Sequence, residues 1–258
     1  LVMINNSGIY FGTVFGMLVS GILSDYFGWR SIFYVSGGVG LTWFALWITT
    51  IKETPSKDPW ISEAEKNYIL KCVGGNDESN KTIATPWLEI LKCGPVWAII
   101  VTHTAYTWGT YTLLTQMPTF LSSIMNIDLS TNGMLSCLPY VVTAFLSIFS
   151  GYLADAIQQK GIMSTLALRK CFICTSSFAQ GFFMLITGYL LTATVSITCL
   201  TVCMGLSAFG LTGFMVNYLD LAPQFSMILL AISNMCATSS GIISPTLTGY
   251  IVKGEVKI

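Results

Sequence analysis

The chain of 258 residues is long enough for one or two soluble domains, but its composition excludes them. Hydrophobic residues make up 53% and charged residues only 9%, against about 25% charged in soluble proteins. The mean hydropathy of +0.69, without short alternating apolar segments, indicates a helical integral membrane protein. The net charge of zero argues against nucleic acid as a partner.

Seven stretches are long and apolar enough to cross a bilayer as helices, which takes about 20 residues. The predicted spans are residues 8–23, 31–51, 96–121, 133–153, 171–191, 195–216 and 225–252. In the first span, Gly12 and Gly16 form a GxxxG face that allows close helix approach. In the last, Gly241 and Pro245 loosen the helix.

Between the second and third spans lies a polar segment, residues 52–95, which holds six of the twelve basic residues. Ser62 and Glu65 fit a capping box, so residues 61–72 are predicted to form a short helix at the membrane surface. The sequence therefore divides into 1–51, a central loop over 52–95, and 96–258.

The third span, 96–121, contains no Asp, Glu, Lys or Arg, yet one of its faces is polar. That polar stripe consists of His103, Tyr106, Thr107, Thr110 and Tyr111. At about 100° per residue these side chains share an arc of roughly 140°. Such a stripe either joins neighbouring helices by hydrogen bonds or lines a polar cavity. The chain's single histidine and two tyrosines on one face favour the cavity.

The cysteine pattern favours packing over metal chemistry. Cys171 and Cys174 have CxxC spacing, and Cys199 and Cys203 lie one helical turn apart, all within apolar runs. No second CxxC or histidine accompanies them, so we predict small buried hydrophobes rather than a zinc site. A phosphate-binding loop and a nucleophile constellation are also missing from the sequence, and we expect neither an enzyme nor a cofactor.

The distribution of positive charge predicts the orientation. Lys160, Arg169 and Lys170 fall in the predicted loop on the same side as segment 52–95, and only three basic residues fall on the other side. Because cytoplasmic loops carry the excess of Lys and Arg, we expect segment 52–95 and the N-terminus in the cytoplasm. A seven-span receptor has the reverse orientation.

Several motifs resemble one transporter family. The stretch SGYLADAIQQKG, residues 150–161, is similar to the glycine–aspartate–basic signature of the major facilitator superfamily. The further motifs are GWRSIFYVSGGVGLTWFALW, ISEAEKNYI, THTAYTWGTYTLLTQMPTFL, NGMLSCLPY, ALRK, NYLDLAP and AISNMCATSSGIISP. Together, in this order, they resemble the anion:cation symporters, the group of sialin, the vesicular glutamate transporters and the type I sodium–phosphate cotransporters. The resemblance implies helices five to eleven of twelve. Residues 1–51 would then be the last two helices of an N-terminal bundle, and residues 96–258 would be five helices of a C-terminal bundle.

The resemblance also implies candidate residues for binding. His103, Tyr106 and Tyr111 would face the central cavity, and Asn217 would add an uncharged hydrogen-bonding group, with Ser233 and Asn234 nearby. Vesicular glutamate transporters carry an arginine where Tyr106 stands, which places this chain closer to the sialin and phosphate-cotransporter side. Since histidine titrates near neutral pH, His103 is either a proton carrier or a structural histidine.

A second set of candidate residues belongs to the gate. Gly151, Asp155, Lys160 and Arg169 form the predicted gating motif, in which Asp155 pairs with Lys160 or Arg169 or caps a helix. Gly151 would permit tight helix contact at the same place.

The expected function is secondary active transport of a phosphate, sialate-like or other carboxylate anion. Coupling to Na⁺ or H⁺ would operate by alternating access, in the plasma membrane or a lysosomal or vesicular membrane. Expected partners are the small anionic solute, the coupling cation and the lipid bilayer. The alternatives are a seven-span receptor- or channel-like protein and a truncated fragment that does not transport.

Overall fold

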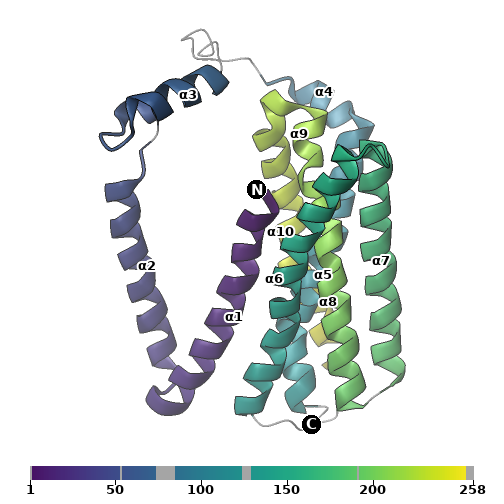
Figure 1. The fold of residues 1–258 in the computed structure, drawn as a ribbon. Coiled ribbons are helices and arrows are strands. Elements are labelled where there is room, and N and C mark those ends of the chain that lie inside the picture. The colour runs from purple at the N-terminus through teal and green to yellow at the C-terminus, as the bar shows by residue number, and fades with distance from the viewer. Residues whose placement is uncertain (1, 53, 74–84, 124–128, 191, 254–258) are drawn as a thin grey trace. The chain divides into compact units, whose positions relative to one another are not determined.

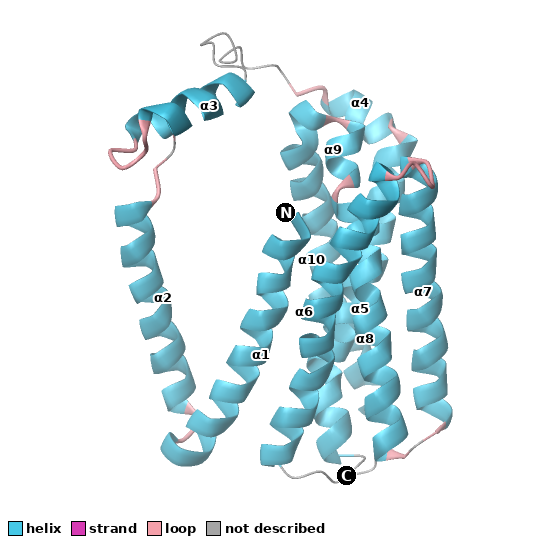
Figure 2. Ribbon diagram, viewed as in Figure 1, coloured by secondary structure: helices cyan, strands magenta, loops and turns pink. Residues whose placement is uncertain are grey.

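The computed structural model describes residues 2–52, 54–73, 85–123, 129–190 and 192–253. All regular structure in these ranges is helical (Figures 1 and 2), which confirms the all-α prediction. The α-helices are α1 (Val2–Phe27), α2 (Arg30–Thr50), α3 (Glu63–Val73), α4 (Trp87–Lys92), α5 (Gly94–Ser123), α6 (Leu129–Gln159), α7 (Thr165–Tyr189), α8 (Ala193–Met215), α9 (Asn217–Leu221) and α10 (Ser226–Lys253). Two short 3₁₀ helices are η1 (Pro55–Lys57) and η3 (Pro223–Phe225).

Each predicted span is a helix, and six helical segments in the described ranges are apolar and long enough to cross a membrane. The six are Val2–Phe27, Arg30–Thr50, Gly133–Gln159, Thr165–Tyr189, Ala193–Leu221 and Pro223–Val252. The remaining predicted span, the third, lies in α5 and is not apolar enough for this group because of its polar stripe. Its 30 residues nevertheless rise about 45 Å, more than the roughly 30 Å of a hydrocarbon core.

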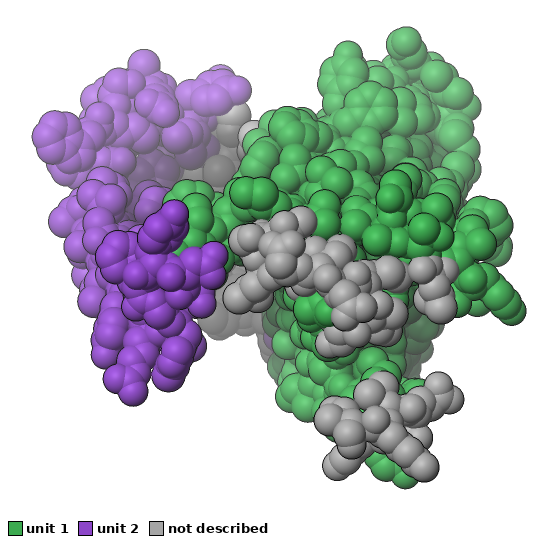
Figure 3. All heavy atoms as spheres, turned by 90° about the horizontal axis from the view of Figure 1, so that it is seen from below, with its two compact units in different colours: residues 1–22, 87–258 green, residues 23–86 purple. Residues whose placement is uncertain are grey.

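Two compact units divide the described chain (Figure 3). The larger combines residues 1–22 with 87–258. Within it α5 packs against α10 and α8, while α6 and α7 also pack against α8. Its core includes Leu121, Ala144 and Cys203, which are fully buried. These units cut α1 and do not follow the predicted segments 1–51, 52–95 and 96–258, whose division stays a prediction.

The smaller unit, residues 23–86, contains α2 and α3. At Gly28 the backbone takes a φ of +78°, a left-handed conformation that glycine adopts readily, and the chain turns from α1 into α2. The Ser62 side chain accepts a hydrogen bond from the Glu65 backbone N–H at 3.2 Å. The predicted cap is therefore confirmed, although α3 begins at Glu63 rather than residue 61.

One expectation about packing is wrong, the one for Cys171 and Cys174, and two further features were not predicted. A Cβ added to Gly12 or Gly16 would meet nothing within 4 Å, so the GxxxG face has no close neighbour in the described structure. Cys199 and Cys203 are buried in α8, as predicted, but Cys171 and Cys174 are exposed on α7. The central loop also contains a helix that the sequence did not predict, α4, whose Leu91 carbonyl accepts a bond from the Trp97 indole at 2.8 Å.

Candidate functional site

His103 lies inside the bundle and joins three helices. Its side chain is buried, and its Nδ1 lies 2.9 Å from the Ser233 hydroxyl of α10 and 3.1 Å from the Tyr218 hydroxyl of α9. Tyr218 also donates to Ser233 at 2.7 Å. The three polar groups therefore form a closed triangle, in which Nδ1 accepts a hydrogen bond when it is unprotonated and donates to the two oxygens when it carries a proton.

Tyr106, one turn further along α5, belongs to a separate network. Its hydroxyl lies 2.8 Å from the hydroxyl of Tyr10 on α1. The Phe214 ring of α8 lies against both residues, with ring centroids 4.9 Å from His103 and 5.3 Å from Tyr106. The two polar networks on α5 thus contact the same aromatic ring. The His103 network includes residues of α9 and α10, and the Tyr106 network includes a residue of α1.

Tyr111 packs on α10 rather than joining either network. A Cβ at Gly241 would come within 3.1 to 3.2 Å of three atoms of the Tyr111 ring, so the ring packs closely against the α10 backbone at this glycine. Asn217 begins α9 and is half-buried, directly before Tyr218. The structure thus brings His103 into contact with Ser233, one of the hydrogen-bonding residues named from the sequence. Tyr111 and Asn217 take no part in that contact.

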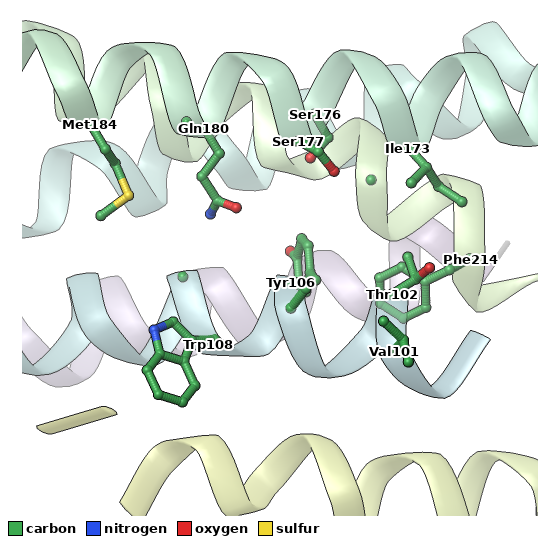
Figure 4. A pocket seen from close by; sticks show the side chains of 14 residues that line it. Val101, Thr102, Tyr106, Trp108, Ile173, Ser176, Ser177, Gln180, Met184 and Phe214 are labelled. Atoms are coloured by element: carbon green, nitrogen blue, oxygen red, sulfur yellow. The ribbon is translucent and has the colours of Figure 1, made fainter. Parts of the chain in front are cut away.

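A cavity of about 470 Å³ lies between α5, α7 and α8 (Figure 4). Its polar lining consists of Thr102, Tyr106, Trp108, Ser176, Ser177 and Gln180. Figure 4 shows Tyr106 reaching into it from α5 and Gln180 from α7. Gly210 of α8 leaves room for Ser176 of α7 and Tyr106 of α5 beside the cavity, because a Cβ there would lie 2.5 Å from the Ser176 hydroxyl and 3.5 Å from the Tyr106 ring.

Arg169 is buried near the start of α7, with a side chain 9% exposed. Its Nη2 donates to Asp220 Oδ2 of α9 at 3.2 Å, and its Nη1 donates to the Thr212 carbonyl of α8 at 3.1 Å. Thr212 in turn bonds through its hydroxyl to Ser150 of α6 at 2.6 Å. The guanidinium therefore holds the ends of four helices together through charge-assisted and neutral hydrogen bonds.

The remaining residues of the predicted gate do not pair with Arg169 in the described structure. Asp155 and Lys160 are exposed, and within the described residues the carboxylate bonded to Arg169 is that of Asp220. Asp155 and Arg169 do line one cavity of about 340 Å³. A Cβ at Gly151 would come 2.8 Å from Met3 Cβ, so the absence of a side chain there lets α1 approach α6.

Reasoning from the sequence missed Tyr10, Tyr218 and Asp220 as partners. Tyr218 and Asp220 lie in the NYLDLAP motif, in which the sequence favours Asn217 because its side chain is an uncharged hydrogen-bonding group. No signal on α1 distinguished Tyr10. Among the described residues, no group of three or more His, Cys, Asp or Glu is arranged to hold a metal ion.

Comparison with known proteins places the chain among transporters. Residues 2–252 match the family model of the Major Facilitator Superfamily. The chain is 38% identical to human sialin over 248 residues, which is 96% of this chain and 50% of sialin. It is 35% identical to human vesicular glutamate transporter 2 over 251 residues, 96% of this chain and 43% of that protein.

A plant relative, probable anion transporter 4, chloroplastic, from Oryza sativa subsp. japonica, is 35% identical over 247 residues, 96% of this chain and 41% of that protein. The chain therefore spans half or slightly less of the length of these relatives. Two of the three are transporters by name, which agrees with the expectation that the chain is not an enzyme. It is a multi-pass membrane protein that belongs to the major facilitator superfamily, in the anion:cation symporter group of sialin and the vesicular glutamate transporters.

Proposed function

We propose that the protein containing this chain is a secondary active transporter that moves a small anion across a membrane by alternating access. A single observation carries the proposal: a helix inside an apolar bundle bears two buried polar networks on one side. Polar side chains within a membrane protein are costly and mark solute or ion pathways. Family membership supports the same conclusion, since sialin and the glutamate transporters match 96% of the chain.

We assign the two polar networks on α5 different roles, one for the coupling cation and one for the solute. The triangle of His103, Tyr218 and Ser233 offers a place for a proton, because a protonated Nδ1 would find two oxygen acceptors within 3.1 Å. Its neighbours from α8, α9 and α10 are Phe214, Tyr218 and Ser233, none of which is charged at neutral pH. We therefore assign His103 to coupling by H⁺, with Na⁺ as the alternative, and Tyr106 and Tyr111 to the solute.

The expected solute is phosphate, a sialate-like sugar acid or another carboxylate. Tyr106 stands where the vesicular glutamate transporters carry an arginine, which disfavours glutamate. Asn217 stays a candidate for solute binding because it borders Tyr218 at the half-buried start of α9. The membrane is the plasma membrane or a lysosomal or vesicular membrane.

Alternating access requires contacts that close one side of the pathway and break when it opens. The approach of Met3 to Gly151 joins α1 to α6, and Ser147 of α6 donates to the Met3 carbonyl at 3.5 Å. These contacts lie at the end where Arg169 binds Asp220. We assign this end to the cytoplasmic gate, in agreement with the basic residues predicted to lie there.

The test is uptake into proteoliposomes that hold the protein expressed from its full reading frame. Labelled N-acetylneuraminate, glutamate and phosphate are offered under an imposed pH gradient or an imposed Na⁺ gradient. We expect the pH gradient to drive accumulation of at least one anion, and His103→Gln to flatten its pH dependence. Accumulation under neither gradient would contradict the proposal and favour a receptor- or channel-like protein or a non-transporting fragment.

A further inference from the structure

Three tyrosine side chains gather where α1, α5 and α6 meet. The hydroxyls of Tyr10 and Tyr106 are hydrogen-bonded, and Tyr140 of α6 belongs to the same core cluster of buried side chains as Tyr10, against which Tyr106 packs. Tyr140 is 3% exposed. Within the described structure its hydroxyl has no hydrogen-bond partner.

A buried hydroxyl without a partner destabilises the protein, because it has lost its bonds to water and gained none in return. Phenylalanine would fill the same space around the Tyr140 ring and avoid that loss. No described residue supplies that partner, so a molecule that enters the cluster and accepts this hydrogen bond would relieve the loss. Tyr10 and Tyr106 add two more hydroxyls, so the cluster offers up to three donors.

The charges near the three tyrosines limit which kind of anion the cluster can bind. None of the three helices contains a lysine or arginine, so the donors are neutral. A carboxylate accepts several hydrogen bonds on two oxygens, and hydrogen bonds from neutral donors to an ionised acceptor are stronger than neutral pairs. A doubly charged phosphate would need more compensation than hydroxyls alone supply.

We propose that Tyr10, Tyr106 and Tyr140 form a hydroxyl cradle for the carboxylate group of the transported solute. This inference rests on the proposed transport function and narrows its substrate to a carboxylate. In the described conformation the cradle is closed, since Tyr10 and Tyr106 bond to each other. On binding, their hydroxyls exchange that bond for bonds to the carboxylate, and Tyr140 gains the partner that it lacks.

The cradle also connects parts of the protein that the sequence assigns to different bundles. Tyr10 lies in predicted segment 1–51, while Tyr106 and Tyr140 lie in 96–258. A carboxylate held by all three would bridge the two bundles, as alternating access around a central site requires.

The test compares Tyr140→Phe with Tyr152→Phe, which alters an exposed tyrosine on the same helix. Binding of N-acetylneuraminate, glutamate and phosphate to the purified protein from its full reading frame is measured by isothermal titration, and the unfolding temperature is recorded without ligand. We expect Tyr140→Phe to raise the unfolding temperature and to weaken carboxylate binding about tenfold or more, the worth of one hydrogen bond to a charged group. We expect Tyr152→Phe to leave carboxylate binding unchanged.

Two results would overturn the cradle while leaving the transport function in place. One is carboxylate binding that Tyr140→Phe leaves unchanged, which would reduce the cluster to packing. The other is weakened binding of phosphate alone, which would assign the hydroxyls to a different anion. A wild-type protein that binds none of the three anions would instead refute the proposed function, and the cradle with it.

Discussion

The ion pair between Arg169 and Asp220 gives the sharpest prediction about the gate. Asp220→Asn keeps the size of the side chain and removes its charge. The buried Arg169 guanidinium then has only neutral acceptors, the Thr212 carbonyl and the new amide oxygen, and its Nε has no partner in the described structure. A buried cation that loses its counter-ion destabilises the folded state.

The magnitude follows from the exposure of the two side chains. Breaking a fully buried pair costs about 3–5 kcal/mol, but Asp220 is 40% exposed, and water screens the charge on that side. We therefore expect a loss of about 1–2 kcal/mol, near the value of one hydrogen bond to a charged group. At a few degrees per kcal/mol, the midpoint of thermal unfolding should fall by about 2–8 °C.

The assay is thermal unfolding of the detergent-solubilised protein, with Asp155→Asn as the matched control. Asp155 lies at the same end and lines the same cavity as Arg169, but it is exposed and makes no ion pair within the described residues. Its substitution should change stability by less than about 0.5 kcal/mol. Equal destabilisation by both variants, or a larger effect of Asp155→Asn, would refute the assignment of Asp220 as the counter-ion.

Three further predictions concern packing, the histidine triangle and orientation. Gly210→Ala should destabilise the protein by about 1–3 kcal/mol, because its Cβ would lie 2.5 Å from the Ser176 hydroxyl in a packed interior. Gly12→Ala, with open space around it, should be neutral or stabilising in the same unfolding assay. A larger loss of stability from Gly12→Ala than from Gly210→Ala would contradict the packing. Tyr218→Phe removes a donor to Ser233 and should shift the pH dependence of uptake, whereas an unchanged profile would separate this tyrosine from coupling. A cysteine at Asn80 should resist impermeant thiol reagents in intact cells, and labelling without permeabilisation would reverse the predicted orientation.

The periodicity of residues predicted the helices well, because apolar runs of bilayer length have few other structures available to them. It also placed His103, Tyr106 and Tyr111 on one side of a helix. The different contacts of these three side chains were not predictable, because helical periodicity gives the face on which a side chain lies but not the helix that packs against that face. Tyr10 is 96 residues away from Tyr106 in sequence, and only tertiary packing brings them together.

The gate shows the same limit. The sequence places Arg169 in a loop and predicts that Asp155 pairs with Lys160 or Arg169 or caps a helix. The structure instead buries Arg169 and pairs it with Asp220, 51 residues further along. The local sequence shows that a charged side chain lies at a helix end. Whether that side chain is buried depends on which other helix ends pack against it.

Cysteine accessibility shows whether the polar face of α5 lines the solute pathway, as we propose. Single cysteines at Thr110 and Tyr111, in a protein from its full reading frame without reactive native cysteines, should react with small hydrophilic thiol reagents. Cysteines at Ile99 and Leu113, which are buried in the apolar core, should not. Addition of N-acetylneuraminate should slow the reaction on the stripe by covering it or by shifting the access equilibrium. Equal reactivity at all four positions, or none at any of them, would show that the stripe is a packing face and would contradict the account.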